Sequence, residues 1–281
     1  MLSYRHAFHA GNHADVLKHY VFSLVLNYLN QKDKPYWVMD THAGAGIYAI
    51  EDAYAQKNAE FLTGISRLID APDLPASLKP YLDAVNAINT HDTFKLYPGS
   101  PQIAAHFLRA QDKLRLFELH PTDFGILQQN LPPLGRQVKA EMTDGFDGLK
   151  ACLPPPTKRG VVLIDPPYEL KEDYQHVVTC IQDSLKRFAI GTYMIWYPLL
   201  QRPEPNDMLK QLHALGVKDW LDVQLVVQAP NEDGMGMYGS GMFVINPPWQ
   251  LPDLLKEAMP ILTQKLSLDH SAKFNLSYNI T

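Results

Sequence analysis

The chain has 281 residues, 46% of them hydrophobic and 20% charged, and a formal net charge of −5 with histidine neutral. This length allows one large α/β domain with an insertion or two domains, and the acidic balance argues against an indiscriminate nucleic-acid binder without excluding a local basic patch. No apolar run reaches membrane-spanning length, the first residues lack the apolar core of a signal peptide, and two cysteines without metal-ligand spacing predict a reduced cytoplasmic protein.

Residues 1–20 bring cationic and titratable side chains together ahead of an amphipathic helix. Histidines stand at positions 6, 9, 13 and 19, with Arg5 and Lys18, against one acid, Asp15. From about Asp15 the apolar residues recur at helical spacing. Two interpretations stay open: a polar lead-in to an ordinary helix, or a tail that folds over a site and brings cations to a carboxylate or phosphate. The irregular spacing of the histidines disfavours a metal site.

A strand is expected at residues 36–40, followed by a glycine loop at 40–46 and then by a helix. An acid, small residues and two glycines, Gly44 and Gly46, make a tight turn that lets backbone approach a ligand. The dinucleotide fingerprint would require a further glycine at Ala49. The loop is similar to the cofactor loop of S-adenosylmethionine enzymes, with His42 where glycine is commoner, although such a glycine pair also serves packing alone.

Residues 50–95 differ from the α/β pattern around them. Apolar positions at helical spacing, at about 59–69 and again at 81–88, are interrupted by Pro72, Pro75 and Pro80. These breaks predict a small helical insertion subdomain within a single domain that spans residues 1–281. The sequence leaves open whether the insertion only covers the sheet edge or also contacts a substrate.

The next two strands are expected to end in acids. A turn at 97–101, with Ser100 as N-cap, opens a helix over 102–109, and the strand at 113–120 then carries Glu118 near its end. A carboxylate in that place can accept hydrogen bonds from both hydroxyls of a ribose. The strand at 137–145 ends in Asp144 and Gly145, which either accept from an adenine amine or form an ordinary Asp-Gly turn.

The run Gly-Val-Val-Leu-Ile-Asp-Pro-Pro-Tyr at 160–168 carries the strongest signal. Its apolar residues predict a strand buried on both faces, and the prolines stop that strand after Asp165. The acid then lies at the carboxyl end of a central parallel strand, where open α/β sheets bind ligands. Asp-Pro-Pro-Tyr in this place resembles the motif of the amino-methyltransferases. The resemblance implies that Asp165 and the Pro166 carbonyl accept from an exocyclic amine and orient it for methylation, with Tyr168 stacked on the extruded base. The alternative is a proline turn with a solvated acid.

The remaining expected elements are a helix over 174–188, a strand at 191–197, a helix over 207–215, and strands at 220–228 and 241–245. Because a loop joins the last two strands, we expect them to pair antiparallel. The run Asn-Pro-Pro-Trp at 246–249 copies the form of the 165–168 motif. The direction of its strand predicts that it lies at the opposite edge of the sheet, so we interpret it as structural.

Four polar clusters therefore follow four successive predicted strands, at 40–46, at Glu118, at 144–145 and at 165–168. Their order is that of class I methyltransferases, in which the methionine and ribose sites come first and the target amine last. The predicted fold class is α/β, a Rossmann-like sheet that is mostly parallel with an antiparallel last strand, plus the small helical insertion.

Motifs at 2–6, 9–19, 40–46, 97–101, 118–121 and 165–168 resemble the bacterial 23S ribosomal RNA adenine-N6 methyltransferase J family over almost the whole chain. The resemblance implies direct methyl transfer from S-adenosylmethionine to adenine N6 of 23S ribosomal RNA, which needs no metal. It places cofactor contacts on His19, His42, Ser100, Glu118, Asp144, Gly145 and Asp165. It also implies that Tyr4 contacts the RNA. His6 and Lys18 would hold the N-terminal tail over the site.

We further expect a cytoplasmic monomer without membrane association, acting on protein-free 23S RNA or on an early assembly intermediate. Without a large basic appendage, RNA affinity should be modest and strongly salt-dependent. Two alternative enzymes share the Asp-Pro-Pro-Tyr type of motif, the DNA adenine-N6 and the protein glutamine-N5 methyltransferases. A non-catalytic RNA-binding module is the remaining alternative, and it would not bind S-adenosylmethionine.

Overall fold

The computed structural model describes residues 6–51, 57, 59–89, 94–131 and 135–281. The described strands are β1 (Trp37–Asp40), β2 (Ile47–Ala49), β3 (Leu96–Pro98), β4 (Lys113–Phe117), β5 (Val138–Glu141), β6 (Gly160–Ile164), β7 (Thr192–Leu199), β8 (Trp220–Val226), β9 (Gly239–Ile245) and β10 (Lys273–Asn279). Eight of these strands form one sheet in the order β10-β8-β9-β7-β6-β1-β4-β5, while β2 and β3 pair as a separate antiparallel ribbon.

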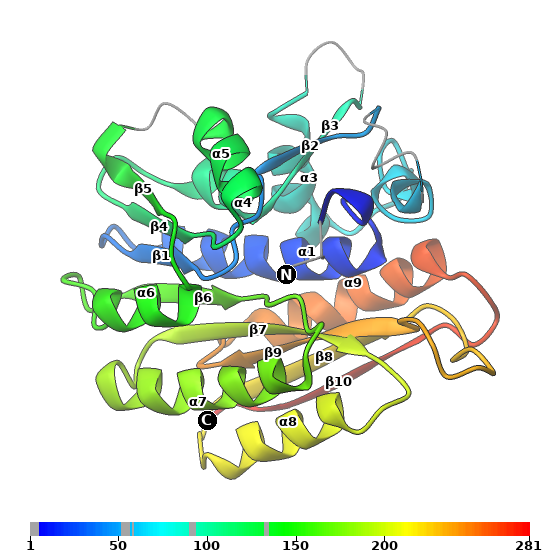
Figure 1. Cartoon of the computed structure of the whole chain (residues 1–281). Coiled ribbons are helices and arrows are strands. Elements are labelled where there is room, and N and C mark those ends of the chain that lie inside the picture. The colour runs from blue at the N-terminus through cyan, green and yellow to red at the C-terminus, as the bar shows by residue number, and fades with distance from the viewer. Residues whose placement is uncertain (1–5, 52–56, 58, 90–93, 132–134) are drawn as a thin grey trace.

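Helices cover both faces of the sheet (Figure 1). The described α-helices are α1 (His13–Asn30), α3 (Lys79–Asn86), α4 (Ser100–Phe107), α5 (Pro121–Asn130), α6 (Gly145–Cys152), α7 (Lys171–Arg187), α8 (Glu204–Ala214) and α9 (Leu251–Leu266). Short 3-10 helices are η1 (His6–Phe8), η2 (Glu60–Leu62), η3 (Ile65–Arg67), η4 (Ala76–Leu78) and η5 (Gly135–Gln137). One apolar cluster joins α1, α3, α4 and α9 to the sheet, and a second joins α6, α7 and α8 to its other face.

The centre of the sheet is parallel, and β6 shows why. All of its residues are buried, as a strand without polar alternation requires. It pairs in parallel with β1 and with β7, and β1 and β4 continue the parallel order to β5. The predicted fold class is confirmed, and the expected strands correspond to β1 and β4 to β9, with ends shifted by a few residues.

The direction of β9 separates the two proline motifs. β9 pairs antiparallel with both β7 and β8, as the connecting loop predicted. The motif at 246–249 therefore begins at the amino end of β7, where the Thr192 hydroxyl donates to the Asn246 carbonyl oxygen at 3.0 Å. The opposite edge carries the motif at 165–168, as predicted from strand direction.

The strand register decides which side chains meet at the carboxyl edge. Ile164 of β6 pairs with Ile195 of β7, so Asp165, which follows β6, lies at the level of Trp196 within β7. β1 is also in register with β6, and the loop after β1 therefore begins beside the end of β6. Because the carboxyl ends of parallel strands share one edge, residues far apart in the sequence converge there.

α1 is an almost completely buried helix that packs against β9 and α4. Its N-cap is Asn12, whose side-chain oxygen accepts from the backbone N–H groups of Ala14 and Asp15. Buried polar residues in its first two turns include Lys18 and His19. A helix that buries a lysine needs charged partners for it, and those partners lie at the carboxyl edge of the sheet.

The helix predicted directly after the glycine loop is wrong. Gly46 has φ near 80°, which turns the chain out of a right-handed helix, and β2 follows with Tyr48 paired to Tyr97 of β3. The Gly99 N–H donates to the Gly46 carbonyl at 2.8 Å and closes the ribbon. Ser100 is also not the N-cap, because Gly99 holds that position and Ser100 is the first residue of α4.

The segment expected as an insertion contains η2, η3, η4 and α3 among its described residues, and its standing as a subdomain stays a prediction. The sequence did not reveal α9 or β10. Pro260 lies inside α9 and masks its helical pattern, and β10 is an edge strand whose side chains are half-buried or exposed. Within the described ranges, no helix has both the length and the apolar character needed to cross a bilayer.

Candidate active site

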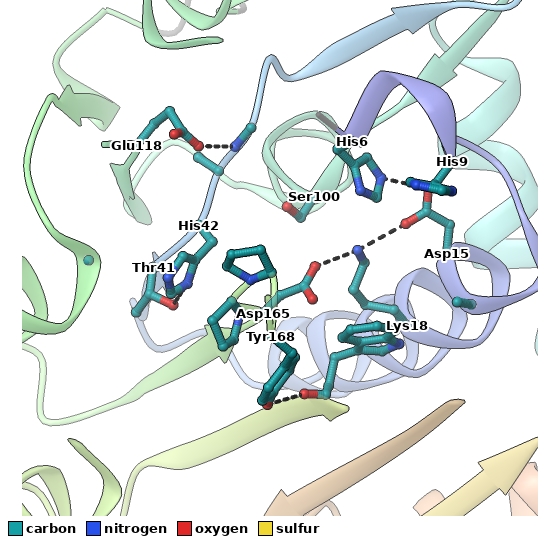
Figure 2. Close-up of a pocket in the computed structure, with 18 of the residues that line it drawn as sticks. His6, His9, Asp15, Lys18, Thr41, His42, Ser100, Glu118, Asp165 and Tyr168 are labelled. Atoms are coloured by element: carbon teal, nitrogen blue, oxygen red, sulfur yellow. Dashed lines mark hydrogen bonds and ion pairs between the residues drawn. The ribbon is translucent and has the colours of Figure 1, made fainter. Parts of the chain in front are cut away.

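A cavity of about 410 Å³ opens at the carboxyl edge of the parallel strands, within the usual size of small-molecule sites. Figure 2 shows side chains from α1, from the loop after β1 and from the end of β6 converging on it. The predicted site residues that line it are His6, Lys18, His19, His42, Gly44, Ser100, Glu118, Asp144, Gly145, Asp165, Pro166 and Tyr168. Gly46 is not part of the lining, and Tyr4 lies outside the described residues.

The loop after β1 brings backbone into the cavity. Gly44 has φ near 59°, and its N–H donates to Glu118 Oε2 at 2.8 Å. The loop also lies so close to the start of α6 that a Cβ on Gly145 would collide with the Thr41 carbonyl oxygen. The predicted glycines therefore serve two purposes: Gly44 provides the left-handed turn, and Gly145 permits the close approach of two strand ends.

The two strand-end acids are held by backbone N–H groups. Glu118 accepts from Gly44 and, through Oε1, from the His120 N–H at 2.7 Å; burial raises the pKa of its carboxyl above the ordinary value. Asp144 caps α6 by accepting from the Phe146 N–H at 2.8 Å. Each carboxylate keeps acceptor capacity beyond these bonds, since an ionised carboxylate offers about four lone-pair sites.

Two buried histidines in the lining are neutral near physiological pH. Burial lowers the pKa of His19 to about 3 and that of His42 to about 4. If the Thr41 hydroxyl donates to the Leu163 carbonyl at 3.1 Å, the hydrogen between His42 Nδ1 and Thr41 Oγ1, 2.8 Å apart, belongs to Nδ1. His42 Nε2 is then a bare acceptor.

His19 leaves one ring nitrogen without a protein partner. Its Nδ1 lies 2.8 Å from the Tyr97 hydroxyl, whereas its Nε2 is buried and makes no hydrogen bond. A buried polar atom without a partner costs free energy, so a ligand group in the cavity would satisfy it. This orphaned nitrogen, the Gly44 turn and the two strand-end acids together fit a ligand with a nucleoside and an amino-acid part.

Asp165 is joined to α1 by a chain of charges (Figure 2). Lys18 Nζ lies 2.6 Å from Asp165 Oδ2 and 2.9 Å from Asp15 Oδ1, and His6 Nε2 lies 2.9 Å from the other oxygen of Asp15. Burial lowers the pKa of Lys18, but Asp15 and Asp165 outweigh that effect and raise it, so the ammonium stays charged. His6 and Lys18 likewise outweigh burial at Asp15 and hold its pKa well below the ordinary value.

Tyr168 is only 3% exposed although it lines the cavity. Its φ is near 51°, its hydroxyl donates to the Trp196 carbonyl at 2.7 Å, and its ring lies 4.5 Å from the Tyr174 ring, centroid to centroid. Most of the ring is therefore covered by protein. A base that stacks on it must use the small accessible face or displace a neighbouring ring.

Several lining residues were not singled out from the sequence, among them Asp15 as the partner of Lys18, Trp196 and Met237. Trp196 could have been found, because it lies on the strand parallel to β6 and one residue beyond the pair that ends β6. Asp15 and Met237 carried no local signal, since one begins a buried helix and the other lies in a glycine-rich loop.

A cavity with these acceptors, at this edge of a sheet with this strand order, defines the chain as a class I S-adenosylmethionine-dependent methyltransferase. The family model described as "Ribosomal RNA large subunit methyltransferase D, RlmJ" matches residues 33–278. The chain therefore belongs to that family of ribosomal RNA methyltransferases.

Individual relatives agree with the family. The chain is 48% identical over 266 residues to "Ribosomal RNA large subunit methyltransferase J" of Escherichia coli (strain K12), covering 95% of this chain and 94% of the relative. It is 47% identical over 267 residues to the protein of the same name from Haemophilus influenzae, with the same coverage. A crystal structure of a Legionella pneumophila protein is similar with a TM-score of 0.89 and 36% identity, covering 96% of this chain and 98% of that one.

Proposed function

We propose that this chain methylates N6 of an adenine in 23S ribosomal RNA, using S-adenosylmethionine. The observation that carries the proposal is the position of Asp165: it ends β6 and lines the same cavity as the orphaned His19 nitrogen, Glu118 and Asp144. A methyl donor held by the latter groups would lie next to an amine held by Asp165. Membership of the RlmJ family supports ribosomal RNA as the acceptor.

The residues that would hold the cofactor are His19, His42, Gly44, Ser100, Glu118, Asp144, Gly145 and Asp165, whereas Gly46, outside the lining, would only shape the loop that carries Gly44. Glu118 would accept from ribose hydroxyls and Asp144 from the adenine amine, each with its remaining lone pairs. The neutral imidazoles of His19 and His42 would contact the polar methionine end without adding charge. When bound, S-adenosylmethionine supplies a methyl carbon on a positive sulfur, and transfer leaves the electron pair of that bond on the sulfur.

Asp165 and Pro166 would prepare the acceptor. The N6 lone pair of adenine is delocalised into the ring, so the amine is a weak nucleophile. Lys18 occupies Asp165 Oδ2, which leaves Oδ1 to accept one N6 hydrogen, while the Pro166 carbonyl accepts the other. The nitrogen then forms its bond to the methyl carbon in line with the departing sulfur and releases one proton.

The cation at Lys18 gives Asp165 a fixed orientation in this proposal. Asp15 balances Lys18, and His6 connects the cluster to the segment that precedes α1. We assign Tyr4 to RNA contact on that segment and Tyr168 to the extruded base, which it would stack upon with its accessible face. We keep the insertion at residues 50–95 as a subdomain of the single 1–281 domain that would cover the sheet edge or contact the substrate. Among its described residues, Glu60 bonds His9 of the segment before α1 at 2.9 Å.

We also propose that the chain acts in the cytoplasm as a monomer, on protein-free 23S RNA or an early assembly intermediate. A flipped base must fit a cavity of about 410 Å³, which favours RNA that is not yet covered by ribosomal proteins. Both cysteines, Cys152 and Cys180, are free thiols, in keeping with a reducing compartment.

The test supplies purified protein with labelled S-adenosylmethionine and three acceptors in parallel: protein-free 23S RNA, adenine-containing duplex DNA, and release factor. Asp165→Ala is the inactive control. Trp249→Ala is the matched control, because Trp249 ends the second proline motif at the other edge of the sheet and is 69% exposed. The expected result is label on RNA, recovered as N6-methyladenosine, with wild type and Trp249→Ala but not with Asp165→Ala.

Other outcomes separate the alternatives. Label on DNA alone or on release factor alone would overturn the RNA assignment and keep the methyl-transfer chemistry. Cofactor binding in calorimetry without label on any acceptor would contradict the proposed acceptors, and absence of cofactor binding would favour a non-catalytic RNA-binding module.

A further inference from the structure

We propose that Arg202, in the turn after β7, is a positioning residue that holds the 165–168 motif in its working conformation. This inference rests on the proposed function and adds a residue to it. Arg202 Nη2 donates to the Tyr168 carbonyl oxygen and to the Tyr174 hydroxyl, both at 3.0 Å. One nitrogen of the guanidinium thus ties the end of the motif to the first turn of α7.

The motif needs such a tie because its last residue is strained. Tyr168 has φ near 51°, a left-handed conformation that costs a non-glycine residue about 1–2 kcal/mol. Strain of this kind persists only where surrounding contacts over-determine the backbone. Tyr168 has two such contacts, one at each end: its hydroxyl donates to the Trp196 carbonyl at 2.7 Å, and its own carbonyl accepts from Arg202.

An arginine suits this position better than a lysine. The guanidinium presents planar donors in a fixed fork, so one group can reach two acceptors in different directions. It also lies over the Tyr174 ring, 5.5 Å from the centroid, and that ring contacts Tyr168 in turn. A series of contacts therefore links the turn after β7 to the motif after β6: Arg202 contacts the Tyr174 ring, and that ring contacts Tyr168.

An acid at the start of α8 lies close to the guanidinium, in an ion pair without a hydrogen bond. Pro203 is the N-cap of α8 and fixes the backbone next to Arg202. Arg202 Nε lies 3.9 Å from Glu204 Oε2, and Lys171 at the start of α7 pairs with the other Glu204 oxygen at 2.6 Å. The turn after β7 and the start of α7 thus share a network that ends on the Tyr168 carbonyl.

Relaxation of Tyr168 would move the acceptors that orient the amine. The Pro166 carbonyl lies two residues before Tyr168, and the two prolines transmit a change of backbone direction because their φ angles are fixed. A misplacement of about 1 Å at a reacting group costs about 10²-fold in rate. Of the proposed cofactor contacts only Asp165 belongs to this motif, and the others lie on α1, on α4 and after β1, β4 and β5. Arg202 bonds Tyr168 and Tyr174 and none of these residues, so cofactor affinity should change little.

The experiment compares Arg202→Ala and Arg202→Lys with Arg159→Lys. Arg159 is a matched control, since it also donates to two backbone carbonyls, of Lys34 and Leu29, both at 2.6 Å, but at the amino edge of the sheet. For each variant we would measure kcat and KM on 23S RNA, cofactor affinity by calorimetry and the thermal midpoint. We expect Arg202→Ala to lose about 10–10²-fold in kcat with cofactor Kd within about twofold of wild type.

Two further readouts distinguish positioning from a general loss of structure. Added guanidinium ion at low millimolar concentration should restore part of the kcat of Arg202→Ala. Arg202→Lys should be intermediate, because a flexible ammonium keeps donors but loses the fixed planar geometry over the Tyr174 ring. Arg159→Lys should lower the thermal midpoint and leave kcat unchanged. If Arg202→Ala does not fold, Arg202→Lys carries the test.

The proposal is overturned if the folded Arg202 variant keeps wild-type kcat, or if its cofactor affinity falls in proportion to kcat. Failure of the proposed function looks different. In that case the wild-type protein itself transfers no methyl group to RNA, whereas failure of this inference leaves wild type active and the Arg202 variants equally active.

Discussion

The run Asp-Pro-Pro-Tyr at 165–168 and the run Asn-Pro-Pro-Trp at 246–249 both follow a fully buried strand. Each also contains a residue in the left-handed region, Tyr168 and Asn246, both with φ near 51°. They lie at opposite edges because β9 runs antiparallel to β7, and β7 runs parallel to β6. The left-handed residue is the last of the first motif and the first of the second, so local sequence repeats the proline stop but not the backbone turn. Strand direction decides which motif meets the cavity.

The surroundings of the two motifs differ in kind. Asp165 faces a buried ammonium, whereas the Asn246 side chain donates to the backbone carbonyls of Ala189 and Gly191 at 2.8 and 2.7 Å. Tyr168 is 3% exposed and bonded through its hydroxyl, while Trp249 is 69% exposed. The comparison indicates that the second motif terminates a strand, whereas the first also places a carboxylate in the lining of the cavity.

The largest expected effect is on kcat, and it distinguishes Asp165 of the first motif from Asn246 of the second. Asp165→Ala should lower kcat by about 10³-fold, the scale of losing a positioned hydrogen-bond partner in a transition state. Asp165→Asn keeps an acceptor oxygen but loses the ion pair with Lys18, so it should lie between Ala and wild type. Asn246→Ala should reduce stability and leave kcat unchanged. Single-turnover methylation of 23S RNA measures all three, and equal losses for Asp165→Ala and Asn246→Ala would remove the distinction between the motifs.

The next effect concerns Lys18, the cation that contacts the first motif and, among the described residues, has no counterpart at the second. Lys18→Met leaves the fully buried Asp15 without its closest cation, and breaking a buried pair costs about 3 kcal/mol or more of unfolding free energy. Lys79→Met is the control, because its exposed pair with Asp83 should contribute less than about 0.5 kcal/mol. Urea unfolding compares them, and a similar small loss in both variants would contradict a stabilising role for the Lys18 cluster.

A smaller effect concerns the two aromatic residues. Tyr168→Phe removes the hydrogen bond to the Trp196 carbonyl and should cost about 1 kcal/mol of unfolding free energy, whereas Trp249→Phe should stay within about 0.5 kcal/mol. Tyr168→Ala also removes the ring and should raise the KM for RNA if the base stacks there. An unchanged KM would exclude Tyr168 as the stacking residue. Trp196, which also lines the cavity, would then be the candidate for stacking on the base.

The smallest effect lies in the segment that covers the first motif. His9 Nδ1 bonds the Glu60 carboxylate at 2.9 Å. This bond raises the pKa of His9, although burial by itself would lower it. The same bond lowers the pKa of Glu60, although burial by itself would raise it. The His9 contribution to stability is therefore complete below pH 6.5 and fades as pH rises through its higher folded value, and that of Glu60 fades as pH falls below 4.5. The stability difference between wild type and His9→Gln should thus shrink from pH 6 to pH 8 in urea titrations, and a constant difference would count against the pair.

Much of the fold could be predicted because its elements carry strong local signals. Residue type and order were enough to predict the buried strand β6, the acids after β4 and β5, and the loop that reverses the chain into β9. The errors occurred where a local signal was weak or masked. Gly46 resembled a helix start but turns into β2, and Pro260 hid α9.

The candidate site was predicted in outline for the same reason. Parallel strands place their ends at one edge, so Glu118, Asp144 and Asp165 converge whatever the loops between them do. Their immediate partners were not predictable in this way. Glu118 and Asp144 are already bonded to backbone N–H groups, and Tyr168 is more covered than a stacking platform would be.

The sequence by itself determined β1 and β4 to β9, the order of their polar ends and the strand direction that sets Asp165 apart from Asn246. Only the tertiary structure decided what Asp165 and Tyr168 touch, since Lys18 is 147 residues from Asp165 and Arg202 is 34 residues from Tyr168. The physical reason is that periodicity and turn chemistry act between near neighbours. The Lys18 and Arg202 contacts depend instead on how α1 and the turn after β7 pack against the end of β6, and that packing is set by the summed burial of both faces of the sheet.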